Sequence, residues 1–261
     1  MIIVIHTSKT MRPAPEVPEL GLGVPCLLDQ AKELQTSLRS LTVDEIQDMM
    51  HVSGSLAETT HTLTSSWTTR VASQRAVIDS FLGDVYSGLQ VGMWTAEDRQ
   101  YANEKMRILS GLYGILRPLD GIFPYRFEMG YKIPRTSFGG AYAFWGDLIA
   151  RTIPSNEIVL NLSAVEYGKV VTKYIDRARI ITPRFLTMSL KTGKPTFVVV
   201  HAKIARGAFA GWVVRDRIDT PDRLKEFSEI GYHYNAALST PQEPVFVCEI
   251  FGGLGLSVRL T

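Results

Sequence analysis

The chain has 261 residues, of which 45% are hydrophobic and 21% charged, and its formal net charge is +2, a balance typical of a soluble globular protein with a substantial core. No apolar run approaches the roughly 18 residues that a membrane span needs, and the apolar residues 1–6 have neither the basic start nor the long apolar core of a signal peptide. The two cysteines, Cys26 and Cys248, show no metal or redox spacing, so we expect buried thiols in a cytoplasmic protein, with a single disulfide as the alternative.

The N-terminal part of the chain predicts one strand followed by a mostly helical layer over residues 26–108. A short β-branched run makes residues 1–6 a buried strand, and a proline-rich loop fills residues 11–25. The pattern of apolar residues then predicts helices at 25–38, 42–50, 53–67, 72–81 and 95–108. Capping boxes, in which Ser or Thr precedes an acidic residue by three positions, mark three helix starts: Thr42–Glu45, Thr95–Asp98 and Ser163–Glu166.

Residues 110–130 form a segment that is irregular, apolar and charged at once. Its glycines and its two prolines, Pro118 and Pro124, argue against a long helix or a central strand, yet it is rich in Leu, Ile, Tyr and Phe. Such a segment must fold onto the rest of the chain, and ordered loops of this kind often carry function. The alternative is a buried connector whose arginines pair with Asp120 and Glu128.

The second half of the chain mixes strands and helices without a regular repeat. We expect strands at 158–162, 179–186, 196–203 and 244–251, with a hairpin turn at 191–194. We expect helices at 144–152, after Ser163, around Phe209–Val213 and after Thr220. Together the elements predict a single α+β domain over residues 1–251, with a central mixed β-sheet, surrounding helices and a glycine-rich tail at 252–261.

Charge is unevenly distributed along the sequence. Residues 16–58 hold eight acidic and two basic side chains, whereas residues 165–217 hold eleven basic and three acidic ones. This asymmetry predicts a positive surface opposite a negative one, and a positive surface attracts ligands that carry phosphate. The alternative is a basic face that is merely solvated.

Lys9 is the first candidate for an anion site. It follows the predicted first strand in a loop of hydroxyl residues, Thr7-Ser8-Lys9-Thr10, where an ammonium group, hydroxyls and backbone N–H groups can meet a phosphate. The loop lacks the glycines of a P-loop, and no helix follows directly. The alternative is an ordinary surface lysine.

A second candidate site is the segment from His201 to Gly207. If residues 196–203 form a strand, His201 and Lys203 share one face and reach its rim. Arg206 would then lie where the next helix begins, beside backbone amides that favour anions. The alternative is that these cations pair with carboxylates. The five histidines show no ligand spacing, so we expect no metal and no cofactor, and His201 is more simply a hydrogen-bonded histidine.

The turn at Ser53-Gly54-Ser55, between two short helices, resembles the hairpin of a helix–hairpin–helix element, whose backbone N–H groups grip a nucleic-acid phosphate. Its flanks argue against this role, because residues 41–67 contain no Lys or Arg but four acidic residues. Phosphate affinity depends on positive charge, so an ordinary helix–turn–helix connection is the favoured interpretation.

The motifs, taken together and in order, resemble the YaaA peroxide-stress protein family. They span about residues 2–250, and the segment Leu109–Gly130 is the most specific of them. The shorter matching pieces are Ser8-Lys9-Thr10 and the stretches 83–90, 144–147, 161–167, 202–207 and 227–234. The acidic flanks of the hairpin and the glycine-rich ending depart from the family pattern.

The resemblance implies a bacterial-type cytoplasmic protein that limits damage from hydrogen peroxide and free iron, with a positively charged cleft, a helix–hairpin–helix element and DNA binding. Carried over by position, the phosphate-binding candidates are Lys9, Arg107, Arg117, Arg126, Lys169, Lys203 and Arg206. We therefore expect a monomeric, non-enzymatic protein that binds DNA independently of sequence. The alternative is an enzyme that acts on a nucleotide or another small phosphorylated molecule, since the charged residues alternate with aromatic ones.

Overall fold

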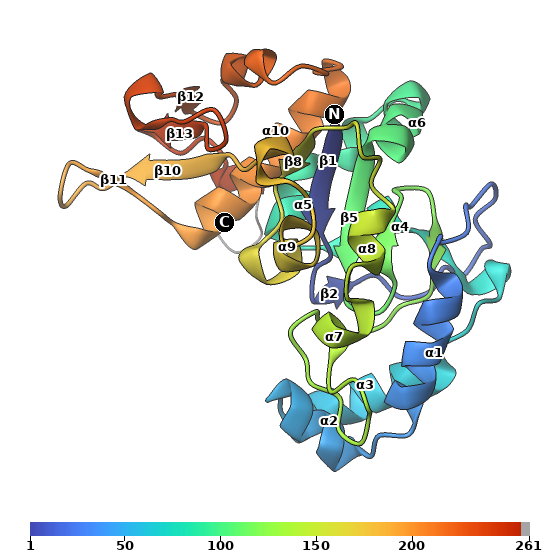
Figure 1. The fold of residues 1–261 in the computed structure, drawn as a ribbon. Coiled ribbons are helices and arrows are strands. Elements are labelled where there is room, and N and C mark those ends of the chain that lie inside the picture. Colours follow the sequence, from blue (N-terminus) through green and yellow to red (C-terminus); the bar gives the residue numbers. More distant parts are fainter. Residues whose placement is uncertain (257–261) are drawn as a thin grey trace.

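A five-stranded sheet lies at the centre of the fold, and β1 (Ile2–His6) is its middle strand (Figure 1). The structure is a computed structural model, and it describes residues 1–256. The strand order is β6-β5-β1-β8-β9, with β1 parallel to both of its neighbours and β6 antiparallel at one edge. The other strands of this sheet are β5 (Met106–Ser110), β6 (Gly114–Leu116), β8 (Val159–Asn161) and β9 (Ile180–Ile181).

The position of β1 determines where a ligand can bind. The chain leaves β1, forms β5 on one side of it, and only later forms β8 on the other side. In open parallel sheets, a reversal of this kind leaves a crevice at the carboxyl end of the central strand. The loop after His6 therefore occupies the place in this sheet where ligands most often bind.

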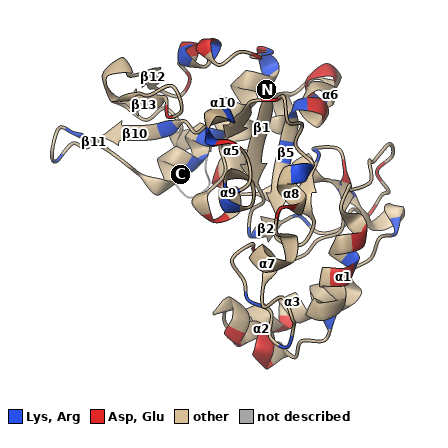
Figure 2. Ribbon diagram, viewed as in Figure 1, with Lys and Arg blue, Asp and Glu red and all other residues tan. Residues whose placement is uncertain are grey.

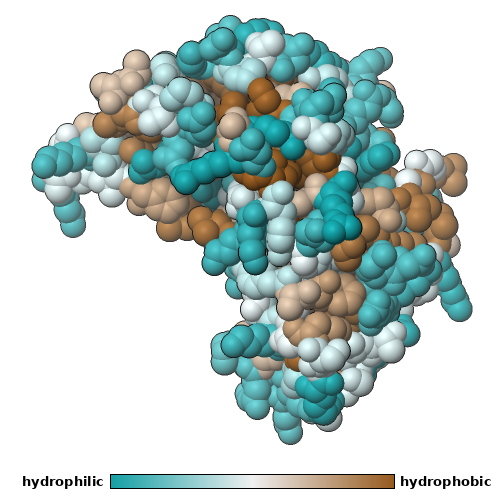
Figure 3. All heavy atoms as spheres, viewed as in Figure 1, coloured by the Kyte–Doolittle hydropathy of each residue, from teal (hydrophilic) through white to brown (hydrophobic). Residues whose placement is uncertain are grey.

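A second sheet, mixed in direction, is formed by the C-terminal half. Its order is β11-β10-β13-β12, with β10 and β13 parallel and the outer pairs antiparallel. The hairpin of β10 and β11 projects from the body of the molecule (Figures 1 and 3). The strands are β10 (Arg184–Met188), β11 (Pro195–Thr196), β12 (Tyr232–Tyr234) and β13 (Val245–Cys248).

Helices surround both sheets, and three of them form a separate lobe, at the bottom of Figure 1: α1 (Leu28–Arg39), α2 (Val43–Met50) and α3 (Gly54–Ser66). The others are α4 (Val77–Ser80), α5 (Asp84–Leu89), α6 (Ala96–Lys105), α7 (Ala141–Trp145), α8 (Leu148–Arg151), α9 (Val165–Thr172) and α10 (Val199–Arg215). Every helix within residues 1–256 is too short or too polar to cross a lipid bilayer.

Short elements complete the fold. Two-stranded ribbons pair β2 (Thr10–Met11) with β4 (Phe81–Leu82) and β3 (Arg75–Ala76) with β7 (Gly121–Ile122). Single 3₁₀ turns lie at Val71–Ser73, Val91–Met93, Arg177–Arg179, Asp222–Glu226, Ala236–Leu238 and Leu254–Leu256.

The predicted α+β class is confirmed, and so are several local predictions. The strand at 1–6 and the hairpin turn at 191–194 form as expected. Two of the three capping boxes form, at Thr42 and Thr95, each with both of its hydrogen bonds. The predicted tail lies only partly within the described residues, and its last five positions, 257–261, lie outside them. The domain boundaries stay a prediction.

The predicted strand at 196–203 is wrong, because the strand ends at Thr196 and α10 begins at Val199. An apparent two-residue alternation in Phe197–Lys203 suggested a strand, but Ala202, Ala205 and Phe209 are buried at helical spacing. Lys203 and Arg206 consequently lie one turn apart on a helix, and Arg206 is not at a helix start.

Four other predicted elements are wrong in their extent. Residues 72–81 are broken into short pieces, because β3 and β4 pair with distant strands. The helix expected to reach 108 ends at Lys105, where β5 begins. Gly146, with φ of 49°, divides the helix expected at 144–152. The strand expected at 179–186 consists of β9 and β10, which belong to different sheets.

The third capping box is also wrong. Ala164 is the N-cap of α9, while the Ser163 hydroxyl donates to Asn161 Oδ1 at 2.6 Å. The Glu166 carboxylate accepts a hydrogen bond from the Gly130 N–H at 2.9 Å instead of closing the box. Likewise, the short helix after Thr220 begins at Asp222 without a side-chain cap.

Both cysteines are free thiols, so the disulfide alternative is excluded. Cys248 is buried, as expected, but Cys26 is exposed, contrary to the prediction.

Candidate functional site

A pocket of about 390 Å³ opens at the carboxyl end of β1, and we call it the β1 pocket. The loop after β1, the N-terminal part of α5, the start of α9 and one turn of α10 all contribute to it. Its lining residues are 6–10, 83–86, Glu128, Ala164, Glu166, Tyr167 and Lys203. The pocket thus lies at the edge of the sheet that the strand order indicates for a ligand.

His6, the last residue of β1, presents a neutral imidazole to this pocket. Burial, together with the nearby Arg206 and Lys203, lowers the pKa of His6 to about 3. Its Nδ1 accepts a hydrogen bond from the Ala164 N–H at 3.2 Å, so the ring proton must reside on Nε2. His6 is therefore a hydrogen-bond donor without a charge.

Two cations on α10 stand next to this histidine. Lys203 lines the pocket, and Arg206 acts on His6 electrostatically even more strongly than Lys203 does. Burial lowers the pKa of Arg206. Neither side chain forms an ion pair with any residue between 1 and 256, so neither positive charge is cancelled by a described carboxylate. Lys203 is the one of the two that lines the pocket.

Lys9 differs from the two α10 cations, because it is already paired. Its ammonium group lies 3.0 Å from Glu128 Oε2. The Arg126 guanidinium donates to the Lys9 carbonyl at 3.2 Å, which places Arg126 at the margin of the pocket. The Glu128 carboxylate and the Lys9 ammonium largely neutralise each other, so the available positive charge comes from α10.

Glycines let α10 approach the pocket closely. A Cβ at Gly207 would overlap the Val85 carbonyl oxygen of α5, and a Cβ at Gly88 would overlap the Ile204 carbonyl oxygen of α10. The backbones of the two helices are therefore in direct contact, a geometry that only residues without a side chain permit. This contact fixes the position of Lys203 relative to the wall formed by Val85 and Tyr86.

Buried tyrosines form hydrogen bonds next to the pocket. The Tyr86 hydroxyl donates to the His6 carbonyl at 3.2 Å, and the hydroxyls of Tyr125 and Ser110 are 2.6 Å apart. Burial raises the pKa of both tyrosines, which keeps the phenols protonated. Tyr86 thereby holds the His6 backbone through an uncharged hydrogen bond.

The charges around the pocket balance. The lining holds two ammonium groups, of Lys9 and Lys203, and three carboxylates, of Asp84, Glu128 and Glu166. Arg206 does not line the pocket, but it adds a third positive charge near His6. Lys9 pairs with Glu128, and Glu166 binds the Gly130 N–H. The site is therefore positive on its α10 side rather than positive throughout.

The remaining predicted cations lie elsewhere. Arg107 donates to the carbonyls of Asn103, Glu104 and Met106 and so closes the end of α6. Arg117 lies near Arg107 and Asp120, and its N–H binds the Asp120 carboxylate at 2.8 Å. Burial raises the pKa of Asp120. These residues form a structural cluster outside the β1 pocket.

Lys169 lies at a third place, in a pocket of about 420 Å³ that it shares with Lys173 and Tyr174. The seven predicted cations thus divide into three groups. Lys9, Lys203 and Arg206 lie in or next to the β1 pocket, with Arg126 at its margin. Arg107 and Arg117 form the second group, and Lys169 is the third. Among residues 1–256, no group of three or more His, Cys, Asp or Glu side chains is arranged to hold a metal ion.

The hairpin residues lie in the lobe of α1–α3. Ser53 accepts a hydrogen bond from the Leu56 N–H at 3.4 Å and so caps α3, and its hydroxyl lies 3.3 Å from that of Ser55. The neighbouring helix α2 carries acidic residues, shown in red in Figure 2. The local structure accounts for Ser53 as a helix cap.

His6, Tyr86 and Ala164 belong to the site although the sequence analysis did not select them. Only one signal could have identified His6: it is a polar residue at the end of a strand buried over its whole length. Tyr86 and Ala164 form hydrogen bonds with His6 across 80 and 158 positions of sequence, and no local pattern reveals such contacts.

Comparison with known proteins gives a consistent result. Residues 1–238 match the family described as peroxide stress protein YaaA. A UPF0246 protein of Salinispora tropica is 53% identical over 259 residues, covering 99% of this chain and 98% of the relative. A UPF0246 protein of Clostridium beijerinckii is 33% identical over 258 residues, covering 96% of this chain and 98% of the relative. The chain therefore belongs to the peroxide stress protein YaaA family.

Proposed function

We propose that the β1 pocket binds a small phosphate-bearing molecule, such as a nucleotide, as part of a role in peroxide stress. The observation that carries the proposal is the pair of α10 cations, Lys203 and Arg206, next to the neutral donor His6 at the carboxyl end of the central strand. Guanidinium and ammonium groups bind phosphate through charge-assisted hydrogen bonds. The proposal is one of binding and assigns no reaction.

Size and charge favour a small ligand over a duplex in this pocket. A volume of about 390 Å³ falls in the range of small-molecule sites, and a duplex of about 20 Å width would not enter it. The pocket lining holds three carboxylates and two ammonium groups, whereas affinity for the DNA backbone depends on an excess of positive charge. The pocket therefore suits a small ligand whose anionic group points toward α10.

DNA binding is the second candidate function, and it would use another surface. The basic stretch 165–217 is the observation that favours it, because several of its Lys and Arg residues lie on the projecting β10–β11 hairpin (Figure 2). Protection of DNA and protein against free iron, which the family resemblance implies, stays a prediction.

Calorimetric titration with AMP and with inorganic phosphate tests the proposal. We expect both probes to bind the wild-type protein, and we expect Lys203→Met and Arg206→Gln to weaken AMP binding about tenfold or more. One charge-assisted hydrogen bond is worth about 1.5–3 kcal/mol, and 1.4 kcal/mol is a factor of ten. Both substitutions retain the side-chain stem, so the melting temperature should stay near that of the wild type.

Two matched variants serve as controls. Lys169→Met and Arg117→Gln each remove one positive charge outside the β1 pocket, and both should retain wild-type AMP affinity. Equal weakening by all four substitutions would indicate a dispersed cationic surface and would contradict the proposal, as would the absence of binding to the wild-type protein at millimolar AMP.

A further inference from the structure

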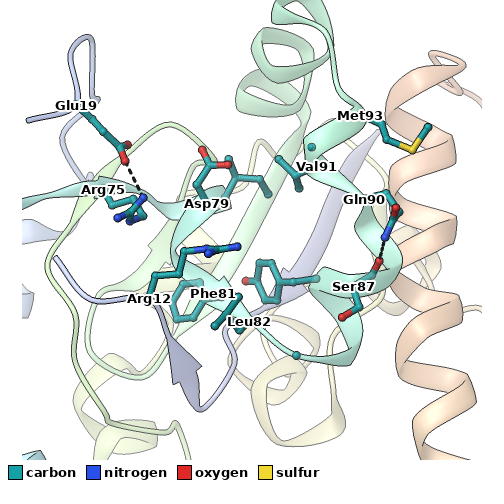
Figure 4. A pocket seen from close by; sticks show the side chains of 14 residues that line it. Arg12, Glu19, Arg75, Asp79, Phe81, Leu82, Ser87, Gln90, Val91 and Met93 are labelled. Atoms are coloured by element: carbon teal, nitrogen blue, oxygen red, sulfur yellow. Dashed lines mark hydrogen bonds and ion pairs between the residues drawn. The ribbon is translucent and has the colours of Figure 1, made fainter. Parts of the chain in front are cut away.

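A second pocket, of about 550 Å³, adjoins the β1 pocket, and Gly83 and Tyr86 line both. We call it the Arg12 pocket (Figure 4). Its polar wall includes Arg12, Glu19, Arg75 and Asp79, and its apolar wall includes Phe81, Val91 and Met93. It contains none of the cations that the sequence analysis selected.

The carboxylates of this pocket are already engaged. Glu19 accepts from the Arg75 guanidinium at 3.2 Å and from the Ala76 N–H at 2.9 Å. Asp79 accepts from both ends of the Arg99 guanidinium, at 2.7 and 2.9 Å. Neither carboxylate is therefore left to repel an incoming anion strongly.

Arg12 supplies an excess positive charge. Its side chain extends into the pocket between Asp79 and Phe81 (Figure 4), and it forms no ion pair with the residues that the structure describes. With Arg99 included, the cluster contains three guanidinium groups (Arg12, Arg75 and Arg99) and two carboxylates (Glu19 and Asp79). The net charge of the cluster is one positive unit, located on the side chain that is best placed to meet a ligand.

Arg75 adds an unsatisfied donor. Its Nε is buried and lacks a hydrogen-bond partner, although the same guanidinium is held by Glu19. An unpaired buried donor costs about 1–3 kcal/mol. A ligand oxygen would recover part of this cost only if it accepted a hydrogen bond from this Nε–H.

The opposite wall is apolar and open to solvent. Met93 is 73% exposed at the rim, with Val91 on the same side of the pocket, whereas Phe81 is buried and lies beside Arg12 (Figure 4). An exposed methionine beside a cationic pocket suits a ligand with an apolar body.

We propose that the Arg12 pocket binds an organic anion, in which a carboxylate or phosphate group meets Arg12 and an apolar body lies against Met93. Both anions match the planar fork of a guanidinium. The site is separate from the one that the proposed function uses, so either proposal can fail without the other.

Titration with benzoate, phenyl phosphate and benzyl alcohol, followed by two-dimensional NMR, tests this inference. We expect benzoate, phenyl phosphate or both to shift the amide signals of Ser87 and of residues 90–93, which line the Arg12 pocket but not the β1 pocket. We expect the neutral alcohol, with the same ring, to bind at least tenfold more weakly. Affinity for one anion alone identifies the preferred group. We expect Arg12→Gln to weaken anion binding at least tenfold.

Arg70→Gln is the matched control, because Arg70 is an exposed arginine outside the pocket, and it should retain wild-type affinity. Lys203→Met should also retain it, which distinguishes this pocket from the β1 pocket. The inference is overturned if neither anion binds, if the alcohol binds equally well, or if Arg12→Gln binds as the wild type does.

Discussion

At the scale of single residues, His6 shows how the fold sets the chemistry of a side chain. The sequence places it at the end of a buried strand, but two cations nearly 200 positions away, Lys203 and Arg206, contribute to its lowered pKa. The sequence analysis could select Lys9 because it follows a strand in a loop of hydroxyl residues, and Lys203 and Arg206 because they are cations in an otherwise apolar stretch. It could not select His6, whose environment exists only after folding.

The lowered pKa of His6 makes a prediction for stability against pH. The unfolded chain binds a proton at this histidine below about pH 6.5, whereas the folded protein does so only near its pKa of about 3. The free energy of unfolding should therefore decrease as the pH is lowered through this window, by at most about 1.4 kcal/mol per pH unit from this group.

Urea unfolding of the wild type and of His6→Asn between pH 5 and 8 measures this effect. Asparagine keeps an acceptor for the Ala164 N–H but does not titrate. The stability of the wild type relative to the variant should be constant above pH 7.5 and should decline below pH 6.5. Parallel curves over the whole range would show that His6 is not held neutral by the fold.

At the scale of elements, the most consequential error of the sequence analysis was to predict a strand at 196–203, where α10 begins at Val199. Its first residues alternate in a way that suits a strand, and the glycines at 207 and 211 weaken the helical signal. The close contact with α5 requires these glycines. A residue type that disfavours a helix locally is thus needed for the packing of that helix, and only the tertiary structure reveals the reason.

Gly207→Ala tests this contact. The added methyl group would overlap Val85 backbone atoms, which cannot move aside as a flexible side chain could. Overpacking of this kind costs about 1–3 kcal/mol or more, so we expect a lower melting temperature and weaker AMP binding as α10 is displaced. Gly92→Ala is the control, since nothing lies within 4 Å of its added Cβ, and it should unfold as the wild type does.

At the scale of the whole molecule, the sequence predicted the fold class and the uneven charge but not how the charges are distributed in space. Strands such as 1–6 and turns such as 191–194 follow from local patterns. The separation of Arg107, Arg117 and Lys169 from the β1 pocket does not, because only contacts made in the folded chain place these three side chains elsewhere.

The charge distribution also makes a prediction for DNA. If the chain binds a duplex, the projecting β10–β11 hairpin should contact phosphates through Lys191 and Lys194, which are exposed at its tip. Affinity for a 20-base-pair duplex should fall steeply between 50 and 200 mM salt, and replacing both lysines with Gln should reduce the slope of log K against log salt by about 2.

Fluorescence anisotropy at several salt concentrations measures this slope. Ser55→Ala, in the acidic lobe, should leave it unchanged. DNA affinity that does not depend on salt concentration, or a slope that is unchanged when both lysines are replaced, would contradict DNA binding by this hairpin.

The central place of β1 also has a consequence for how the protein folds. Ile3 pairs with Met106 on one side and with Leu160 on the other, so the middle strand of the sheet cannot be completed until partners more than a hundred residues downstream are available. Contacts of such large sequence separation slow folding. During synthesis, the β-branched run Ile2–Ile5 leaves the ribosome long before either neighbour and must be kept from pairing with other chains.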